Sequence, residues 1–138
     1  MRYKCVAYTS LASLDLDEQQ LLDIHSAARD LNALDGITGL LLFNGTHFLQ
    51  WIEGPPRAID ELVEKLRRDP RHDGFEVRDE RYSDERLFGH WAMELVQARG
   101  RFFSARHDLA TILPPGLPEP VRERVLAMAE RVAAEVEL

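Results

Sequence analysis

Two polar side chains in apolar segments of the sequence are candidates for chemistry. Tyr8 ends an alternating segment near the amino terminus, and Gln50 stands between Leu49 and Trp51 in a second apolar segment. If the two segments are neighbouring strands, their parity can place both side chains on one sheet face. An unpaired amide inside a central strand would cost roughly 1 to 3 kcal/mol, so a buried Gln50 needs a partner. A glutamine on a solvated strand edge would explain Gln50 equally well.

A third candidate is Asn32, which continues an apolar ridge on a predicted helix. Ile24, Ala28 and Asn32 follow one another at intervals of four residues, so they share one helix face. An amide at the end of such a ridge either caps the helix or contacts a ligand. On the residues alone, the cap is the favoured interpretation.

The sequence contains none of the common catalytic or metal-binding motifs. There is no HExxH helix, phosphate loop or GxGxxG segment. Asp15 and Asp17 are typical of a helix start rather than of an acid/base carboxylate pair. The single cysteine, Cys5, lies in an apolar run and is interpreted as a buried core thiol. No close pair with metal-ligand spacing occurs among the histidines, which are His25, His47, His72, His90 and His107. We therefore expect neither an enzyme nor a metal site.

Composition limits the class of protein further. The 138 residues suffice for one domain of ordinary size with an appendage, and 45% of them are hydrophobic, enough to bury a core. Seventeen basic and 24 acidic residues give a net charge of -7, so nucleic acid is not an expected partner. The amino terminus lacks the apolar core of a signal peptide, and no segment approaches the ~20 apolar residues that span a bilayer. We expect a cytoplasmic protein without a membrane partner.

Periodicity and turn signals predict the elements that must position these residues. Residues 2–8 predict a first strand, and Asp15 with Glu18 has the spacing of a capping box, which predicts a helix from about Leu16 to the stop at 35–36. The remaining elements are a hairpin of residues 37–43 and 47–53 around Asn44–Gly45, a helix between Pro56 and Pro70, and strands over 75–82 and 91–96.

This order predicts an α+β protein with a ferredoxin-like βαββαβ fold and an added fifth strand. In that topology the first and third strands are central neighbours, which would bring Tyr8 and Gln50 together. After Gly100, a short helix is expected over 104–113 and a final helix follows the Pro114–Gly116 break. The apolar stripe of this final helix consists of Val121, Val125, Met128 and Val132. Packing on the free sheet face is favoured over a dimer or partner surface for this stripe.

The motif over 36–54 resembles the signature of the BLUF family, the sensors of blue light using FAD. Segment 36–42 (Gly-Ile-Thr-Gly-Leu-Leu-Leu) is followed by Asn44–Gly45, Phe48, Gln50 and Glu53–Gly54 at the family's spacing. Matching residues extend from Tyr8 to Met93. The family's fold is the ferredoxin-like arrangement expected from periodicity, with the flavin between the two helices over the sheet.

The resemblance implies a function and a set of site residues. It implies that Tyr8 and Gln50 are a photoactive pair, in which Tyr8 gives an electron to the excited flavin and Gln50 relays the proton and rearranges its hydrogen bonds. Trp91 and Trp51 could compete with Tyr8 as electron donors, or each is a packing residue. The implied flavin contacts, besides Tyr8 and Gln50, are Ile24, Ala28, Asn32, Phe48, Arg71 and His72. FAD is the expected cofactor, with FMN and riboflavin as alternatives because Leu31 and Lys65 depart from the family pattern.

The resemblance also implies how the signal leaves. Trp91 and Met93 would report the state of the glutamine to the sheet. We expect residues 1–98 to form the photosensor and residues 99–138 a helical extension that covers the free sheet face or mediates assembly. The partners would then be a flavin, an unidentified regulatory protein and further copies in a homo-oligomer. A flavin-free interaction module of the same fold is the alternative, whereas a small hydrolase such as an acylphosphatase lacks its anion loop here.

Overall fold

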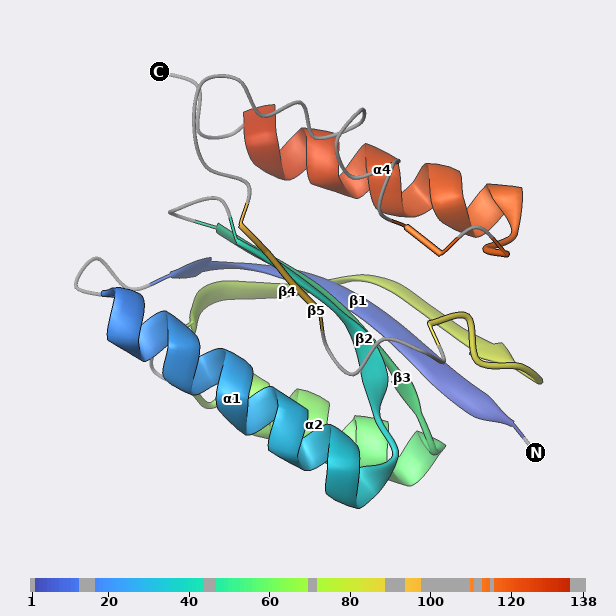
Figure 1. The fold of residues 1–138 in the computed structure, drawn as a ribbon, viewed down its shortest axis with the longest axis horizontal. Coiled ribbons are helices and arrows are strands. Elements are labelled where there is room, and N and C mark those ends of the chain that lie inside the picture. Colours follow the sequence, from blue (N-terminus) through green and yellow to red (C-terminus); the bar gives the residue numbers. More distant parts are fainter. Residues whose placement is uncertain are drawn as a thin grey trace.

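The computed structural model describes residues 2–12, 17–43, 47–69, 72–88, 94–97, 110, 113–114 and 116–134. These residues form one sheet with helices on both faces (Figure 1). In chain order the elements are β1 (Tyr3–Ala12), α1 (Glu18–Asp35), β2 (Thr38–Phe43), β3 (His47–Gly54), α2 (Pro56–Arg67), β4 (His72–Ser83), β5 (Glu94–Gln97) and α4 (Glu119–Ala134).

The strand order confirms the predicted α+β fold. The sheet runs β4-β1-β3-β2-β5, with β1 and β3 side by side at its centre. Neighbouring strands are antiparallel except β2 and β5, which are parallel, so β5 is the strand added to the ferredoxin-like arrangement. Of the predicted strand over 91–96, residues 94–96 lie in β5, which continues to Gln97, and residues 91–93 lie outside the described part.

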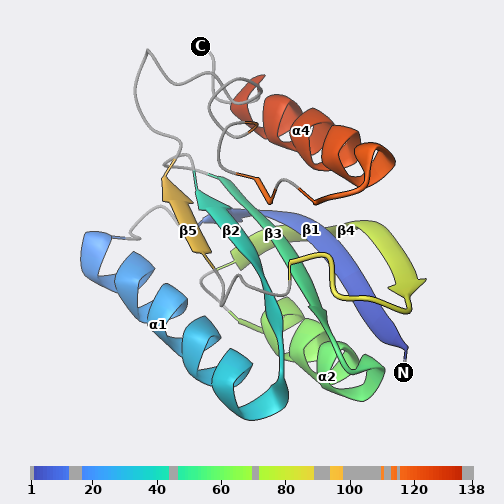
Figure 2. The same ribbon diagram turned by 45° about the vertical axis from the view of Figure 1, so that its right-hand side comes forward.

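Side-chain alternation divides the core into two layers. Helices α1 and α2 cover one sheet face and α4 covers the opposite face, as both views show (Figures 1 and 2). The first layer contains Val6, Leu41, Phe43, Phe48 and Ile52 from the strands, with Leu21 and Ile24 from α1 and Ile59 from α2. The second layer contains Cys5, Ala7, Leu40, Leu42, Leu49 and Trp51. Because successive strand residues point to opposite faces, Gln50 and Trp51 serve different layers.

Helix α4 packs its apolar stripe on the second layer. Val121, Val125, Leu126 and Ala129 are buried there together with Leu117. Met128 is partly buried against the same cluster, and the side chain of Val132 is outside the described part. Among the helices of the described residues, none is long and apolar enough to cross a membrane.

The start of α1 corrects the predicted capping box. The Asp17 carboxylate accepts a hydrogen bond from the Gln20 backbone N–H (2.8 Å), and the Gln20 side chain accepts one from the Asp17 backbone N–H (2.9 Å). This reciprocal pair is a capping box two residues later than the predicted pair of Asp15 and Glu18. Both pairs have the same spacing, so the sequence pattern alone could not choose between them. The helix begins at Glu18 rather than near Leu16.

Glycines end α1 and allow close strand packing, which explains two positions of the motif. Gly36 follows the helix with φ 68°, the left-handed conformation common just after a helix end. Gly39 in β2 has φ 153°, and a Cβ there would lie 1.8 Å from the Trp51 carbonyl oxygen.

Asn32 lies inside α1, three residues before its end, so the interpretation of Asn32 as a C-terminal cap is wrong.

Two strands are longer than the sequence pattern predicts. β1 continues to Ala12 because both neighbours pair with it along its length: Leu11 lies opposite His47, and Ala12 opposite His72. The predicted strand over 75–82 is likewise extended to 72–83.

Helix α2 ends at Arg67, before Pro70. Pro70, Asn44–Gly45 and most of the predicted helix over 104–113 lie outside the described residues.

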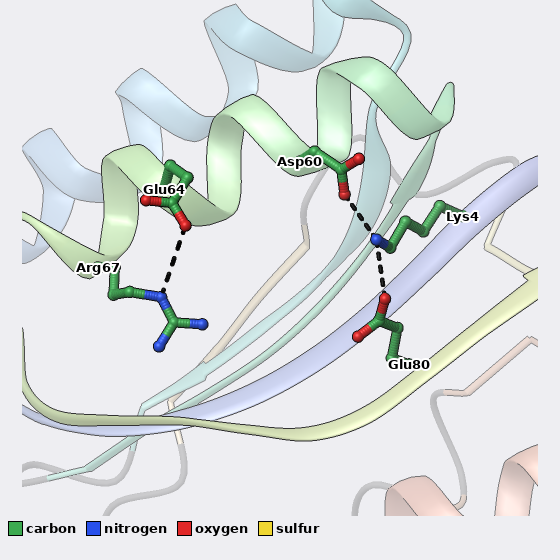
Figure 3. Close-up of polar contacts among 5 residues, drawn as sticks. All are labelled: Lys4, Asp60, Glu64, Arg67 and Glu80. Atoms are coloured by element: carbon green, nitrogen blue, oxygen red, sulfur yellow. Dashed lines mark hydrogen bonds and ion pairs between the residues drawn. The ribbon is translucent and has the colours of Figure 1, made fainter.

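A lysine in β1 holds α2 and β4 together beside the first layer. Figure 3 shows the Lys4 ammonium between two carboxylates: Nζ lies 2.6 Å from Asp60 Oδ1 of α2 and 2.8 Å from Glu80 Oε1 of β4. The Lys4 side chain is 11% exposed, whereas those of Asp60 and Glu80 are 60% and 52% exposed. Hydrogen bonds to Asp60 and then to Glu80 raise the pKa of Lys4. The ion pairs fix the amino-terminal half of α2 over the sheet.

We predict that Lys4→Met lowers the free energy of unfolding by about 1 to 2 kcal/mol, because it removes two charge-assisted hydrogen bonds. The loss is no larger because water can solvate the exposed carboxylates that remain. Urea denaturation at neutral pH measures the change. The control is Arg57→Met, which removes an ion pair to Glu61 whose side chains are 93% and 73% exposed; there we expect a change within about 0.5 kcal/mol. Equal losses in the two variants would contradict the prediction.

Candidate functional site

The two candidates Tyr8 and Gln50 form a buried polar pair in the middle of the sheet. They are directly opposite each other in the β1–β3 register. The Tyr8 hydroxyl donates a hydrogen bond to Gln50 Oε1. Tyr8 is 1% exposed and Gln50 is 4% exposed. The structure therefore excludes the solvated-edge interpretation of Gln50, and the buried amide has a partner as its desolvation requires.

Apolar side chains surround this pair on the face that α1 and α2 cover. Ile24 of α1 is 7% exposed and belongs to the same buried cluster as Phe48, which lies two residues before Gln50 on β3. Phe43 of β2 stacks on Phe48 with ring centroids 4.7 Å apart. Ile24 and Phe48, both predicted site residues, are thus brought into one layer with the polar pair.

Phe75 of β4 also contacts Tyr8, and the sequence pattern did not identify it as a site residue. Its ring stacks on the Tyr8 ring with centroids 4.5 Å apart, and the guanidinium of Arg67 lies 5.0 Å from the Phe75 centroid. Strand periodicity could not find Phe75, because the β1–β4 register shifts between Ala7 and Tyr8. A β-bulge breaks the simple alternation that relates one strand to the next.

The environment of Tyr8 keeps its phenol protonated. Burial is the larger cause that raises the pKa of Tyr8, and the negative charge of Asp69 raises it further. Both effects disfavour the phenolate, because it would be a second negative charge in a low-dielectric site. Tyr8 can therefore donate to Gln50 throughout the ordinary pH range.

Other predicted site residues occupy positions that the structure describes only in part. Ala28 and Asn32 lie in α1, and His72 lies at the start of β4 opposite Ala12, but their side chains are outside the described part. Arg71, Trp91 and Met93 lie outside the described residues altogether. Their roles as flavin contacts and signal readout stay predictions.

Trp51 lies on the sheet face opposite Tyr8 and Gln50. It is 2% exposed and packs in the α4 layer, with its ring centroid 5.6 Å from that of Phe88. This position supports the interpretation of Trp51 as a packing residue. On the face that α1 and α2 cover, Tyr8 supplies a buried hydroxyl, whereas the rings of Phe43, Phe48 and Phe75 carry none.

The residues at this site fit a flavin ring. A flat ring with carbonyl and nitrogen atoms along one edge requires apolar contacts on its faces and a few hydrogen-bonding groups at that edge. The layer offers aliphatic and aromatic side chains, Ile24 and Phe48, next to a phenol and a carboxamide. The carboxamide is both donor and acceptor, so Gln50 can contact Tyr8 and a ligand together.

Comparison with known proteins identifies the family. The family model described as sensors of blue-light using FAD matches residues 3–94. The blue light- and temperature-regulated antirepressor BluF of Escherichia coli (strain K12) is 34% identical over 92 residues, which are 67% of this chain and 23% of the relative. This chain thus spans about a quarter of the length of that curated relative.

Solved structures agree in fold. BlrB, a BLUF protein in its dark state, is 32% identical with a TM-score of 0.71, and the match covers 98% of both chains. BlrP1 of Klebsiella pneumoniae, in its complex with FMN and cyclic diGMP, is 30% identical with a TM-score of 0.79, covering 96% of this chain and 36% of that one. With its fold, its buried tyrosine–glutamine pair and a family match over most of its length, the chain belongs to the BLUF family of blue-light sensors that use FAD.

Proposed function

We propose that Tyr8 and Gln50 are the light-driven switch of this photoreceptor. The observation that carries the proposal is their buried hydrogen bond, in which Tyr8 is the donor and Gln50 Oε1 the acceptor. The pair lies in a layer whose apolar and hydrogen-bonding side chains suit a noncovalently held flavin, which is FAD in the family. We propose that the flavin contacts are Tyr8, Ile24, Ala28, Asn32, Phe48, Gln50, Arg71 and His72.

The two side chains have complementary tasks. When bound, the flavin supplies absorption of blue light and becomes a strong electron acceptor. Tyr8 can give up an electron at low cost only if its phenolic proton leaves at the same time, and Gln50 Oε1 already accepts that proton in a hydrogen bond. Because burial and Asp69 favour the protonated phenol, the proton returns to Tyr8 once the electron does.

Gln50 can end this cycle in a different state from the one in which it began. Its carboxamide has an acceptor end and a donor end, so a rotation or a change of tautomer exchanges what it offers to its neighbours. A new hydrogen bond to the flavin carbonyl would shift absorption to the red. We propose that Trp91 and Met93 detect this change and transmit it to the sheet.

The output of the switch is proposed to be a change in protein association. Residues 1–98 would be the photosensor and residues 99–138 the extension that covers the second sheet face or mediates assembly. The burial of Val121 and Val125 on that face supports the first role. We propose that the chain itself has no enzyme activity, works in the cytoplasm as a homo-oligomer, and regulates a partner protein. Its one cysteine is a buried free thiol, which suits a reducing compartment.

We predict that purified protein loaded with FAD shows a reversible red shift of its flavin absorption after blue light, and that Tyr8→Phe and Gln50→Leu abolish the shift. Both variants should still bind the flavin, because the apolar layer remains. Absorption spectra before and after illumination measure both properties.

The matched control is Tyr82→Phe, which removes the hydroxyl of a tyrosine that is 48% exposed and should leave the red shift intact. Normal light responses in both site variants would refute the mechanism. A wild-type protein that takes up no flavin would instead support the flavin-free interaction module.

We also predict that Tyr8 does not ionise in the native protein between about pH 9 and 11, where an ordinary tyrosine titrates. A pKa that is raised on folding stabilises the native state below the unfolded value of about 10, and this contribution is lost as pH rises above it. Near-ultraviolet tyrosinate absorbance is the measurement. Tyr8→Phe should leave the native titration unchanged but remove one of the three phenols that titrate in denatured protein. A smaller native signal in the variant would contradict the expectation.

A further inference from the structure

Glu53 is a completely buried carboxylate on the sheet face opposite Tyr8 and Gln50. It lies near the end of β3 and is 0% exposed. Its Oε1 accepts a hydrogen bond from the Thr38 hydroxyl of β2 at 3.1 Å, and its Oε2 lies 3.7 Å from the Cys5 thiol of β1. The Thr38 hydroxyl in turn accepts a hydrogen bond from Arg86 (3.2 Å). A buried carboxylate is costly unless donors surround it, so this position requires an explanation.

The strongest donors to Glu53 are two successive backbone N–H groups. Leu87 N–H donates to Oε2 at 2.9 Å, and Phe88 N–H donates to Oε1. Paired backbone N–H groups form a concave site for an anion, and here the anion is a side chain of the same protein. Glu53 thus joins three central strands to the segment that follows β4.

The Cys5 thiol adds a weaker contact to this arrangement. Burial and then the Glu53 charge raise the pKa of the Cys5 thiol to about 12. The thiol therefore stays protonated and donates toward the carboxylate rather than repelling it.

Phe88 is held to β3 at a second point. Its side chain is 0% exposed, and its ring packs on Trp51 with centroids 5.6 Å apart. Trp51 and Glu53 are two residues apart on β3 and share a face, while Gln50 precedes Trp51 and faces the other way. The strand that carries the switch glutamine therefore also carries both anchors of the segment after β4.

We propose that Glu53 is a positioning residue for light signalling, whose carboxylate fixes Leu87 and Phe88 on β3 and sets where the chain toward Trp91 and Met93 begins. The inference rests on the proposed function for those two residues. Only five residues separate Phe88 from Glu94, which pairs with Leu40 of β2. Phe88 and Glu94, the described residues on either side of this segment, are both held to the sheet, so we infer that a shift of the Glu53 anchor is passed on toward Trp91 and Met93.

Glu53→Gln tests the proposal in the full chain loaded with FAD. The amide keeps the size of the side chain, but its nitrogen cannot accept a hydrogen bond, so one of the two backbone N–H groups that donate to Glu53 loses its acceptor. We expect normal flavin binding and a normal red shift. In the dark, amide exchange at Leu87 and Phe88 should become faster. The return of the red-shifted state in the dark should change by about threefold or more, the order expected for one lost hydrogen bond.

Two controls separate positioning from general destabilisation. Glu85→Gln alters an exposed carboxyl group on the same segment, and Lys4→Met weakens the fold on the other face. Both should recover at the wild-type rate. If Glu53→Gln does not fold, Thr38→Val removes one donor to Oε1 and should change the recovery rate relative to the wild type.

The possible failures are distinct. Protected Leu87 and Phe88 amides in Glu53→Gln would overturn the anchoring step. Exposed amides with an unchanged recovery rate would show that Glu53 only fastens the segment, and would overturn the positioning role. A wild-type protein without a red shift would overturn the proposed function, and with it this inference, before any variant is compared.

Discussion

The antiparallel register of β1 on β3 is the constraint on which both the switch and its surroundings depend. In this register Tyr8 lies opposite Gln50, and Cys5 lies opposite Glu53. Because side chains alternate along each strand, the same pairing puts the phenol and the carboxamide under α1 and α2 while the thiol and the carboxylate lie on the α4 face. A slip of one residue would exchange the two faces and separate every polar pair.

The sequence was sufficient for this central part of the fold. The apolar runs on either side of Asn44–Gly45 predicted the β2–β3 hairpin, and the order of elements predicted that β1 and β3 are neighbours. Parity then predicted a shared face for Tyr8 and Gln50, which the structure confirms. Periodicity succeeded here because both strands are regular where they pair, so two-residue alternation holds without interruption.

The sequence failed where a local pattern had several solutions or where regularity breaks. Two overlapping residue pairs have the spacing of a capping box, Asp15 with Glu18 and Asp17 with Gln20. Only the hydrogen bonds show that Asp17 and Gln20 cap α1. The stacking of Phe75 on Tyr8 depends on register shifts between β1 and β4, which no spacing rule contains. The contacts of Glu53 were also hidden, because its donors at Leu87 and Phe88 are backbone groups more than 30 residues away.

The cover that α4 provides sets an energetic limit on how the sensor communicates. Val121, Val125, Leu126 and Ala129 are each at most 4% exposed, and burying one large aliphatic side chain is worth about 1.5 to 3 kcal/mol. A switch made of one rearranged hydrogen bond is worth only about 1 kcal/mol. Complete detachment of α4 therefore demands several times the work that such a switch supplies. Under the proposed function, the lit state therefore keeps α4 on its core and differs from the dark state by modest displacements, so a partner would have to distinguish two closely similar surfaces.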